Sequence, residues 1–159
     1  CVVVAIGARA ARIAVAERLE RLGARLISAL HPLAICSPTA RLGRHVIAGA
    51  RAIIGVHAVV REHVVLSPGC IVEHDNELQE GAFLEPAVRL AGGVTVGRCA
   101  RIGIGAFVIP GRTLGADSRV EPGGVVIADV PPGCVVGGAP ATLRKGDERA
   151  IVEKVAVGA

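Results

Sequence analysis

Apolar residues recur at every sixth position of the chain from Cys36 to Val126, and no insertion interrupts the series. All sixteen members are apolar, and fourteen of them are Leu, Ile or Val. A mostly small residue lies two positions before each member, and a glycine often follows directly after it. The series is Cys36, Leu42, Ala48, Ile54, Val60, Leu66, Val72, Leu78, Leu84, Leu90, Val96, Ile102, Val108, Leu114, Val120 and Val126.

This period predicts short strands joined by tight corners. Residues two apart on a strand share one face, so each hexad would point one large and one small side chain inward. A glycine after the inward residue allows the backbone angles of a sharp turn. Repeated strands and corners build a prism whose coils stack about 4.8 Å apart. A β-sandwich would instead place its turns about 8–12 residues apart, so we predict an all-β solenoid, a parallel β-helix.

The two ends of the chain do not follow the period of six. Residues 2–6 and 24–30 are predicted strands on either side of a helix over residues 10–22, which has helical apolar spacing and ends at Gly23. A β-α-β unit of this size cannot bury both its helix and its sheet. It is similar to the last unit of a Rossmann-like domain whose earlier strands are absent. A short helix is predicted over residues 147–156.

Three segments carry a resemblance to a known family: Glu73-His74-Asp75, residues 90–97 (LAGGVTVG) and residues 129–141 (DVPPGCVVGGAPA). Together with the repeat, they resemble the hexapeptide-repeat acyltransferases, in the branch of the bacterial sialic-acid O-acetyltransferases and UDP-4-amino-sugar N-acetyltransferases. The resemblance implies a left-handed parallel β-helix of about five coils. It places a remnant of a Rossmann-like sugar-nucleotide domain at residues 1–30, the β-helix at 31–139, and a loop with a short helix at 140–159.

The resemblance implies transfer of an acetyl group from acetyl-CoA to the amine or hydroxyl of a sugar, which we expect to be a nucleotide-linked amino sugar. In the family, the histidine that matches His74 is the general base. Imidazole suits this role because its unperturbed pKa lies near neutrality, and such a base contributes about 10²–10⁴-fold to the rate. Asp75, with Glu73 as the second choice, would hold the tautomer of His74. A catalytically inactive trimeric scaffold is the alternative.

Two positions that the resemblance assigns to the acceptor or the catalytic network differ from the family pattern. Ser67 stands where the family usually has Asn, and Phe83 stands where it has a second His. Glu85 replaces a usual small residue. These changes bear on substrate and activity more than on fold. Asn76 occupies an inward small position, where its buried amide needs hydrogen-bond partners.

Acetyl-CoA is expected in a groove between neighbouring subunits, lined by backbone amides of the later coils. Glycine lets the pantetheine approach the backbone closely, although each glycine is also explained by its corner alone. A basic residue after the prism would meet the nucleotide phosphates. The expected contacts are Gly92, Gly93, Gly105, Ala106, Gly111 and Arg144, with Lys145 as the alternative to Arg144.

Three further histidines, His45, His57 and His63, each lie three positions past an inward residue. His45 and His63 are one coil apart and would stack. Because the γ-class carbonic anhydrases share the prism and bind a metal ion through histidines at subunit boundaries, a metal hydratase is a further alternative. The spacing of the close pair differs from the spacing in those enzymes. We therefore interpret all three as surface corners and expect no metal.

The outward residues predict an assembly. Residues eighteen apart stack on one wall of the prism, which gives two apolar walls and one polar wall. Apolar walls of this extent are normally buried against a partner, so we expect a homotrimer. The apolar walls carry Ile53, Ile71, Phe107 and Val125 on one side, and Ile47, Val65 and Phe83 on another.

Composition narrows the classes of function. Hydrophobic residues make up 52% of the chain, with two Phe and no Trp, Tyr or Met, so small aliphatic residues must build the core. The net charge of +4, scattered arginines and few aromatics argue against a nucleic-acid partner. Five widely spaced cysteines indicate reduced, mostly buried thiols in a cytoplasmic protein. No apolar run is long enough to span a bilayer, so we expect no membrane partner. The missing Met means either a trimmed initiator or a fragment of a longer chain.

Overall fold

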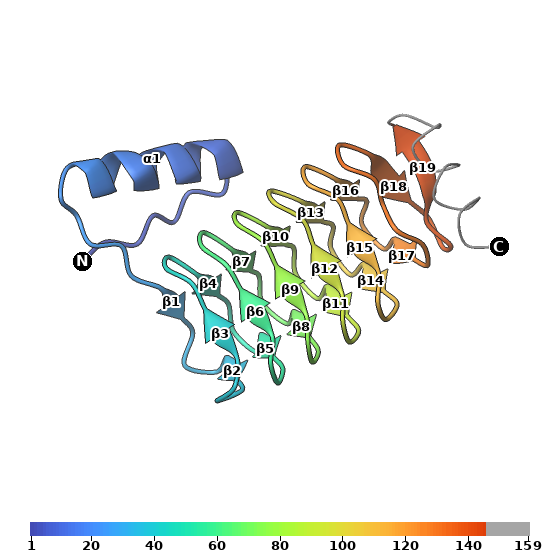
Figure 1. Cartoon of the computed structure of the whole chain (residues 1–159), viewed down its shortest axis with the longest axis horizontal. Helices are drawn as coiled ribbons and strands as arrows, with labels where there is room; N and C mark the ends of the chain where they lie inside the picture. Colours follow the sequence, from blue (N-terminus) through green and yellow to red (C-terminus); the bar gives the residue numbers. More distant parts are fainter. Residues whose placement is uncertain (146–159) are drawn as a thin grey trace.

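The computed structural model describes residues 1–145, which form a parallel β-solenoid with one helix at its N-terminal end (Figure 1). The predicted all-β solenoid is confirmed. The predicted helix over residues 147–156 lies outside the described residues. No helix of the described part is long and apolar enough to cross a membrane.

Three parallel sheets form the walls of the prism, and each strand pairs with the strand one coil away. The first wall consists of β1 (Ala29–Leu30), β4 (Ile47–Ala48), β7 (Val65–Leu66), β10 (Phe83–Leu84), β13 (Arg101–Ile102), β16 (Arg119–Val120), β18 (Val135–Gly137) and the antiparallel β19 (Thr142–Lys145). The second wall consists of β2 (Ile35–Cys36), β5 (Ile53–Ile54), β8 (Ile71–Val72), β11 (Arg89–Leu90), β14 (Phe107–Val108) and β17 (Val125–Val126). The third wall consists of β3 (Arg41–Leu42), β6 (Val59–Val60), β9 (Glu77–Leu78), β12 (Thr95–Val96) and β15 (Thr113–Leu114).

The six-stranded second wall shows that the chain makes about six turns, one more than the predicted five. The extra turn begins at β1, whose residues Ala29 and Leu30 pair in register with Ile47 and Ala48. Residues 2–6 and 24–30 are therefore not the two continuous strands that were predicted. Leu26 makes a parallel bridge to Val2, and the chain then enters the prism.

The inward positions of the hexads form one continuous core. Leu66, Leu84 and Ile102 stack on the first wall and are fully buried, as the period of six predicts. The corners also pack coil on coil: a Cβ on Gly97 would lie 2.5 Å from the backbone nitrogen of Ala116. Only glycine fits such a place without moving the backbone of the next coil.

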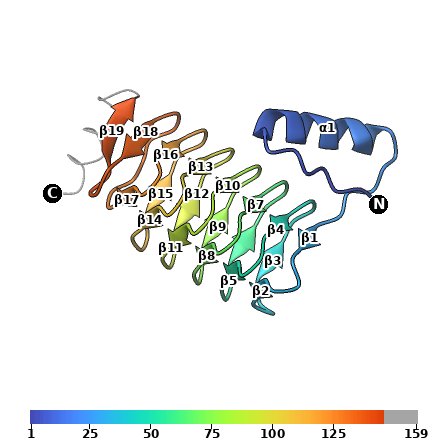
Figure 2. The same ribbon diagram turned by 180° about the vertical axis from the view of Figure 1, so that it is seen from behind.

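Helix α1 (Arg9–Arg21) lies beside the first coils of the prism, and both views show it there (Figures 1 and 2). Arg12 fastens it, because its side chain is almost completely buried against the first wall. One guanidinium nitrogen donates to the carbonyl of His63 at 3.2 Å and another donates to the carbonyl of Ile6 at 3.3 Å. The guanidinium also lies over the ring of Phe83, 5.6 Å from its centre. Part of one predicted apolar wall is thus covered by the chain's own helix.

His45 and His63 are buried beneath this N-terminal unit, so their interpretation as surface corners is wrong. They do stack as predicted, with 2.9 Å between their Nδ1 atoms. Nε2 of His45 accepts the backbone N–H of Val4 at 3.0 Å. With its acceptor nitrogen used in this way, a neutral His45 carries its proton on Nδ1 and donates it to His63. Burial lowers the pKa of His45, and the charges of His63 and Arg12 lower it further.

The lowered pKa of His45 predicts a loss of stability in mild acid. Over the range below the ordinary histidine pKa of about 6.5, the unfolded chain binds more protons than the folded protein. The free energy of unfolding should therefore fall as the pH drops through this range and be regained above it. Denaturant unfolding at about pH 7.5 and about pH 5.5 measures the difference.

The variant His45→Gln should reduce this pH dependence, whereas His31→Gln, which changes an exposed histidine, should leave it intact. An unchanged dependence in His45→Gln would contradict the assignment.

Candidate active site

The segment Glu73-His74-Asp75 forms the corner that follows β8 on the second wall. The next residue, Asn76, points inward and is buried, and its amide finds the partners that its position requires. Its Nδ2 donates to the carbonyl of Glu73 at 2.9 Å, and its Oδ1 accepts the N–H of Val94 at 2.5 Å. Asn76 thus ties this corner to the corner of the next coil.

His74 and Asp75 form an imidazole–carboxylate pair. Nδ1 of His74 lies 2.8 Å from Oδ2 of Asp75. A carboxylate only accepts hydrogen bonds, so Nδ1 carries the proton and Nε2 keeps an unshared electron pair. The hydrogen bond from His74 lowers the pKa of Asp75, and the charges of His74 and His57 lower it further. The carboxylate therefore stays ionised and keeps this tautomer of His74.

Gly92 leaves room for the imidazole ring of His74. A Cβ at this position would lie 2.4 Å from both Cε1 and Nε2 of His74. Because these are the atoms on the basic side of the ring, a side chain at residue 92 would push the base away from its place. Gly92 therefore positions His74 by having no side chain.

A hollow of about 450 Å³ opens beside His74 on the second wall. Arg89 and Phe107, which lie on adjacent strands of this wall, contribute to its lining. Arg89 was not among the predicted site residues, although it lies eighteen residues after Ile71 and pairs with it. The lining residues are Ile71, Glu73, His74, Arg89, Leu90, Ala91, Gly92 and Phe107.

The other positions predicted for acetyl-CoA divide between two edges of the second wall. Gly93 lies next to His74, and the N–H of Gly111 donates to the carbonyl of Gly92 at 3.0 Å, so these positions share one corner column. Gly105 and Ala106 precede β14 at the opposite edge of this wall. The side chain of Ala106 is buried in the core, which leaves only its backbone for a ligand.

Arg144 lies far from His74 along the prism, on the terminal strand β19. Its Nε is 3.6 Å from Oε2 of Glu121, and the side chain is half exposed. It is thus a partly neutralised cation at the C-terminal end of the first wall.

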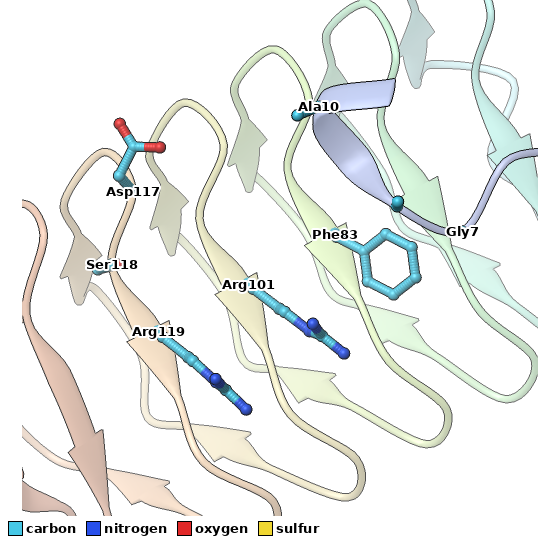
Figure 3. Close-up of a pocket in the computed structure, with 8 residues that line it drawn as sticks. Gly7, Ala10, Phe83, Arg101, Asp117, Ser118 and Arg119 are labelled. Carbon is cyan, nitrogen blue, oxygen red and sulfur yellow. The ribbon is translucent and has the colours of Figure 1, made fainter. Parts of the chain in front are cut away.

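Ser67 lies in the corner that follows β7, and Phe83 lies on β10 of the first wall. Both were predicted to contact the acceptor, and neither lines the hollow at His74. Phe83 instead lines a second hollow of about 410 Å³, between the N-terminal segment and β13 and β16. Figure 3 shows Arg101 and Arg119 extending in parallel from these neighbouring strands, with Gly7 close to the Phe83 ring. Within one chain the two hollows are separate.

Glu85 and Arg101 form an ion pair at the edge of this second hollow. The carboxylate of Glu85 is nearly buried, and its Oε2 accepts the N–H of Ile104 at 3.0 Å. The guanidinium of Arg101 lies 5.8 Å from the centre of the Phe83 ring. Two departures from the family pattern, Phe83 and Glu85, therefore meet at one arginine.

Residues 1–145 contain no group of three or more His, Cys, Asp or Glu side chains that could hold a metal ion. His45 and His63 contact each other and the N-terminal segment, inside the protein. This pair does not offer the open ligands that the metal-hydratase alternative requires.

No family model matches the chain, and no curated protein matches it. Solved structures do. The chain is 39% identical to PerB of Caulobacter crescentus, solved with CoA and GDP-perosamine, over 90% of this chain and 69% of PerB, with a TM-score of 0.88. It is 30% identical to the acetyltransferase domain of PglB from Neisseria gonorrhoeae, over 89% of this chain and 69% of that domain, with a TM-score of 0.87.

A UDP-N-acetylglucosamine acyltransferase from Campylobacter jejuni, at 15% identity over 79% of this chain and 81% of that one, shares the fold with a TM-score of 0.54. The two closer similarities cover nearly all of the described prism and its N-terminal unit. They agree with the predicted hexapeptide-repeat solenoid. The chain therefore belongs to the hexapeptide-repeat acyltransferases, in the branch that contains PerB and the PglB acetyltransferase domain, and it is an acyltransferase.

Proposed function

We propose that the protein transfers the acetyl group of acetyl-CoA to the amine of a nucleotide-linked amino sugar, with His74 as the general base. The observation that carries the proposal is the 2.8 Å contact between Nδ1 of His74 and the Asp75 carboxylate, which leaves Nε2 basic at the edge of a hollow. PerB, solved with CoA and GDP-perosamine, supports the choice of substrates. Variants of a perosamine N-acetyltransferase from Caulobacter crescentus, in which one histidine is replaced by Ala or Asn, were also solved with CoA and GDP-perosamine.

In this mechanism the acceptor amine attacks the carbonyl carbon of the thioester, and Nε2 of His74 takes the proton that the amine loses. Asp75 stabilises the imidazolium that forms, as the buried aspartate does in a Ser-His-Asp triad. When the tetrahedral intermediate collapses, the C–S bond breaks and the imidazolium returns its proton to the leaving thiolate. The products are the N-acetylated sugar and CoA with a free thiol. An acceptor hydroxyl would follow the same course.

The residues around His74 fit a CoA ester. Gly93 and Gly111 have no side chains at successive levels of one corner column, so a chain such as pantetheine can lie against the backbone beside His74. A Cβ on Gly111 would meet nothing within 4 Å, which shows that this backbone is open. Arg89 supplies a positive charge in the same hollow, and Arg144 supplies another at the C-terminal end.

A homotrimer would complete the site. The hollow at His74 lies on the outer face of the second wall, where Phe107 is 39% exposed and Ile35 is 62% exposed. A neighbouring copy on this wall would bury these side chains and exclude water from the thioester. It would also allow the Phe83 hollow of one copy to face His74 of the next, so that acceptor and base come from different subunits.

Replacing the base tests the mechanism directly. The variant His74→Ala should lower kcat/KM by about 10²–10⁴-fold, because the proton of the acceptor then has no base. Turnover is read as thiol release from acetyl-CoA with a panel of UDP- and GDP-linked amino sugars. His31→Ala is the control at an exposed histidine. Undiminished turnover in His74→Ala would end the assignment of this base.

The contact between Gly92 and His74 gives a second test. Gly92→Ala should lower kcat by about tenfold or more, because the new Cβ displaces the imidazole. Val56 and Ala128 occupy the same corner position in other coils, so the backbone tolerates a side chain there and the protein should fold. Thermal unfolding checks this. An activity equal to that of the wild type would show that the ring need not lie on Gly92.

The assembly gives a third test. Phe107→Glu should shift the mass in light scattering from that of a trimer towards that of a monomer, because a charge in a buried interface is unfavourable. Turnover should fall in parallel. The control Thr95→Glu, on the polar third wall, should leave the mass unchanged. A trimer that persists in Phe107→Glu would place the interface elsewhere.

A further inference from the structure

His57 lies at the same corner as Asp75, one coil earlier. The strands before the two corners pair in register, with Ile53 opposite Ile71. His57 and Asp75 also share a left-handed backbone, with φ of 57° and 56°. The regular stacking of coils therefore brings a histidine beneath the carboxylate that holds the general base.

The two oxygens of Asp75 face two different imidazoles. Oδ2 lies 2.8 Å from Nδ1 of His74, and Oδ1 lies 3.4 Å from Nδ1 of His57. All three side chains are more than half exposed in the single chain. An exposed ion pair contributes little to stability, so the effect of His57 must be sought in the orientation of the carboxylate.

The neighbouring coils offer His57 as the side chain that can orient the Asp75 carboxylate. The backbone N–H of His57 donates to Oγ1 of Thr39 at 3.0 Å, which fixes the corner from below. On the other side, Gly93 follows Asp75 in the corner column and has no side chain. Within residues 1–145, His57 is the side chain of a neighbouring coil that contacts Asp75.

We propose that His57 is a positioning residue for the catalytic base: it holds Oδ1 of Asp75, so that Oδ2 remains on Nδ1 of His74. An aspartate free to rotate about its side-chain bonds would release His74 to other tautomers and ring orientations. Partners of this kind, one step removed from the reacting group, commonly change activity when they are lost. The inference rests on the proposed function, in which His74 removes the proton of the acceptor.

The test compares two substitutions at residue 57. His57→Ala should lower kcat by about tenfold and leave the KM for acetyl-CoA unchanged, because the base is misplaced while the binding surface is kept. His57→Asn should restore most of kcat, because its Nδ2–H lies near the place of the histidine Nδ1 and Asn accepts a left-handed backbone. Ala87 adopts a φ of 60° at another corner, so alanine is compatible with this conformation.

Arg51→Ala is the matched control, since Arg51 is an exposed corner residue with a φ of 57°. It should leave kcat unchanged. In an Asp75→Ala background, His57→Ala should have no further effect on kcat, because its only route to His74 has been removed. Additive losses, or wild-type kcat in His57→Ala, would overturn the proposal.

The same assays separate this inference from the proposed function. If His74→Ala and Asp75→Ala lower kcat but His57→Ala does not, only the role of His57 fails. If none of the three variants loses activity, the proposed base itself is wrong.

Discussion

The fold depends on one constraint: each residue stacks on the residue eighteen positions earlier, in the preceding coil. Parallel pairing in constant register places residues eighteen apart above one another along the whole prism, as in Phe83 on Val65 and Arg101 on Phe83. Each inward hexad residue then adds to one continuous core without any large aromatic side chain. The corners follow the same rule, so a glycine such as Gly97 packs against the backbone of the next coil. A residue inserted within a strand would shift the later side chains out of their columns, whereas an insertion at a corner can form a loop.

The candidate site is a product of this stacking as much as of its own residues. Sequence adjacency gives the His74–Asp75 pair, but the next coil supplies Gly92 for the imidazole and the previous coil supplies His57 for the carboxylate. Asn76 connects the same levels through buried hydrogen bonds, which carry more weight in the interior than at the surface. A base on an exposed corner is thereby held by contacts from three coils.

Much of this arrangement follows from the sequence, because a strict period determines which residues lie inside and which residues stack. The burial of the hexads, the need of Asn76 for partners and the pairing of His74 with Asp75 were all predictable. The burial of His45 and His63 was not predictable, because it depends on the N-terminal unit, which docks through Arg12. The sequence of that unit does not follow the period of six. The additional coil, in contrast, was predictable: Leu30 of β1 lies six positions before Cys36 and continues the apolar series, which begins one hexad earlier than predicted. Arg89 was also predictable, because it lies eighteen residues after Ile71 on the second wall. It was missed because only the apolar residues of that wall were considered.

The departures from the family at Phe83 and Glu85 are physically linked rather than independent. A nearly buried carboxylate is costly unless it is paired, and Arg101 provides the pair for Glu85. The same guanidinium lies over the ring of Phe83, as does that of Arg12. A neutral aromatic ring is attracted by both cations, whereas a histidine there would be disfavoured from taking up a proton between them. Phe83, Glu85 and Arg101 thus contact one another, and they give the first-wall hollow a charge arrangement of its own.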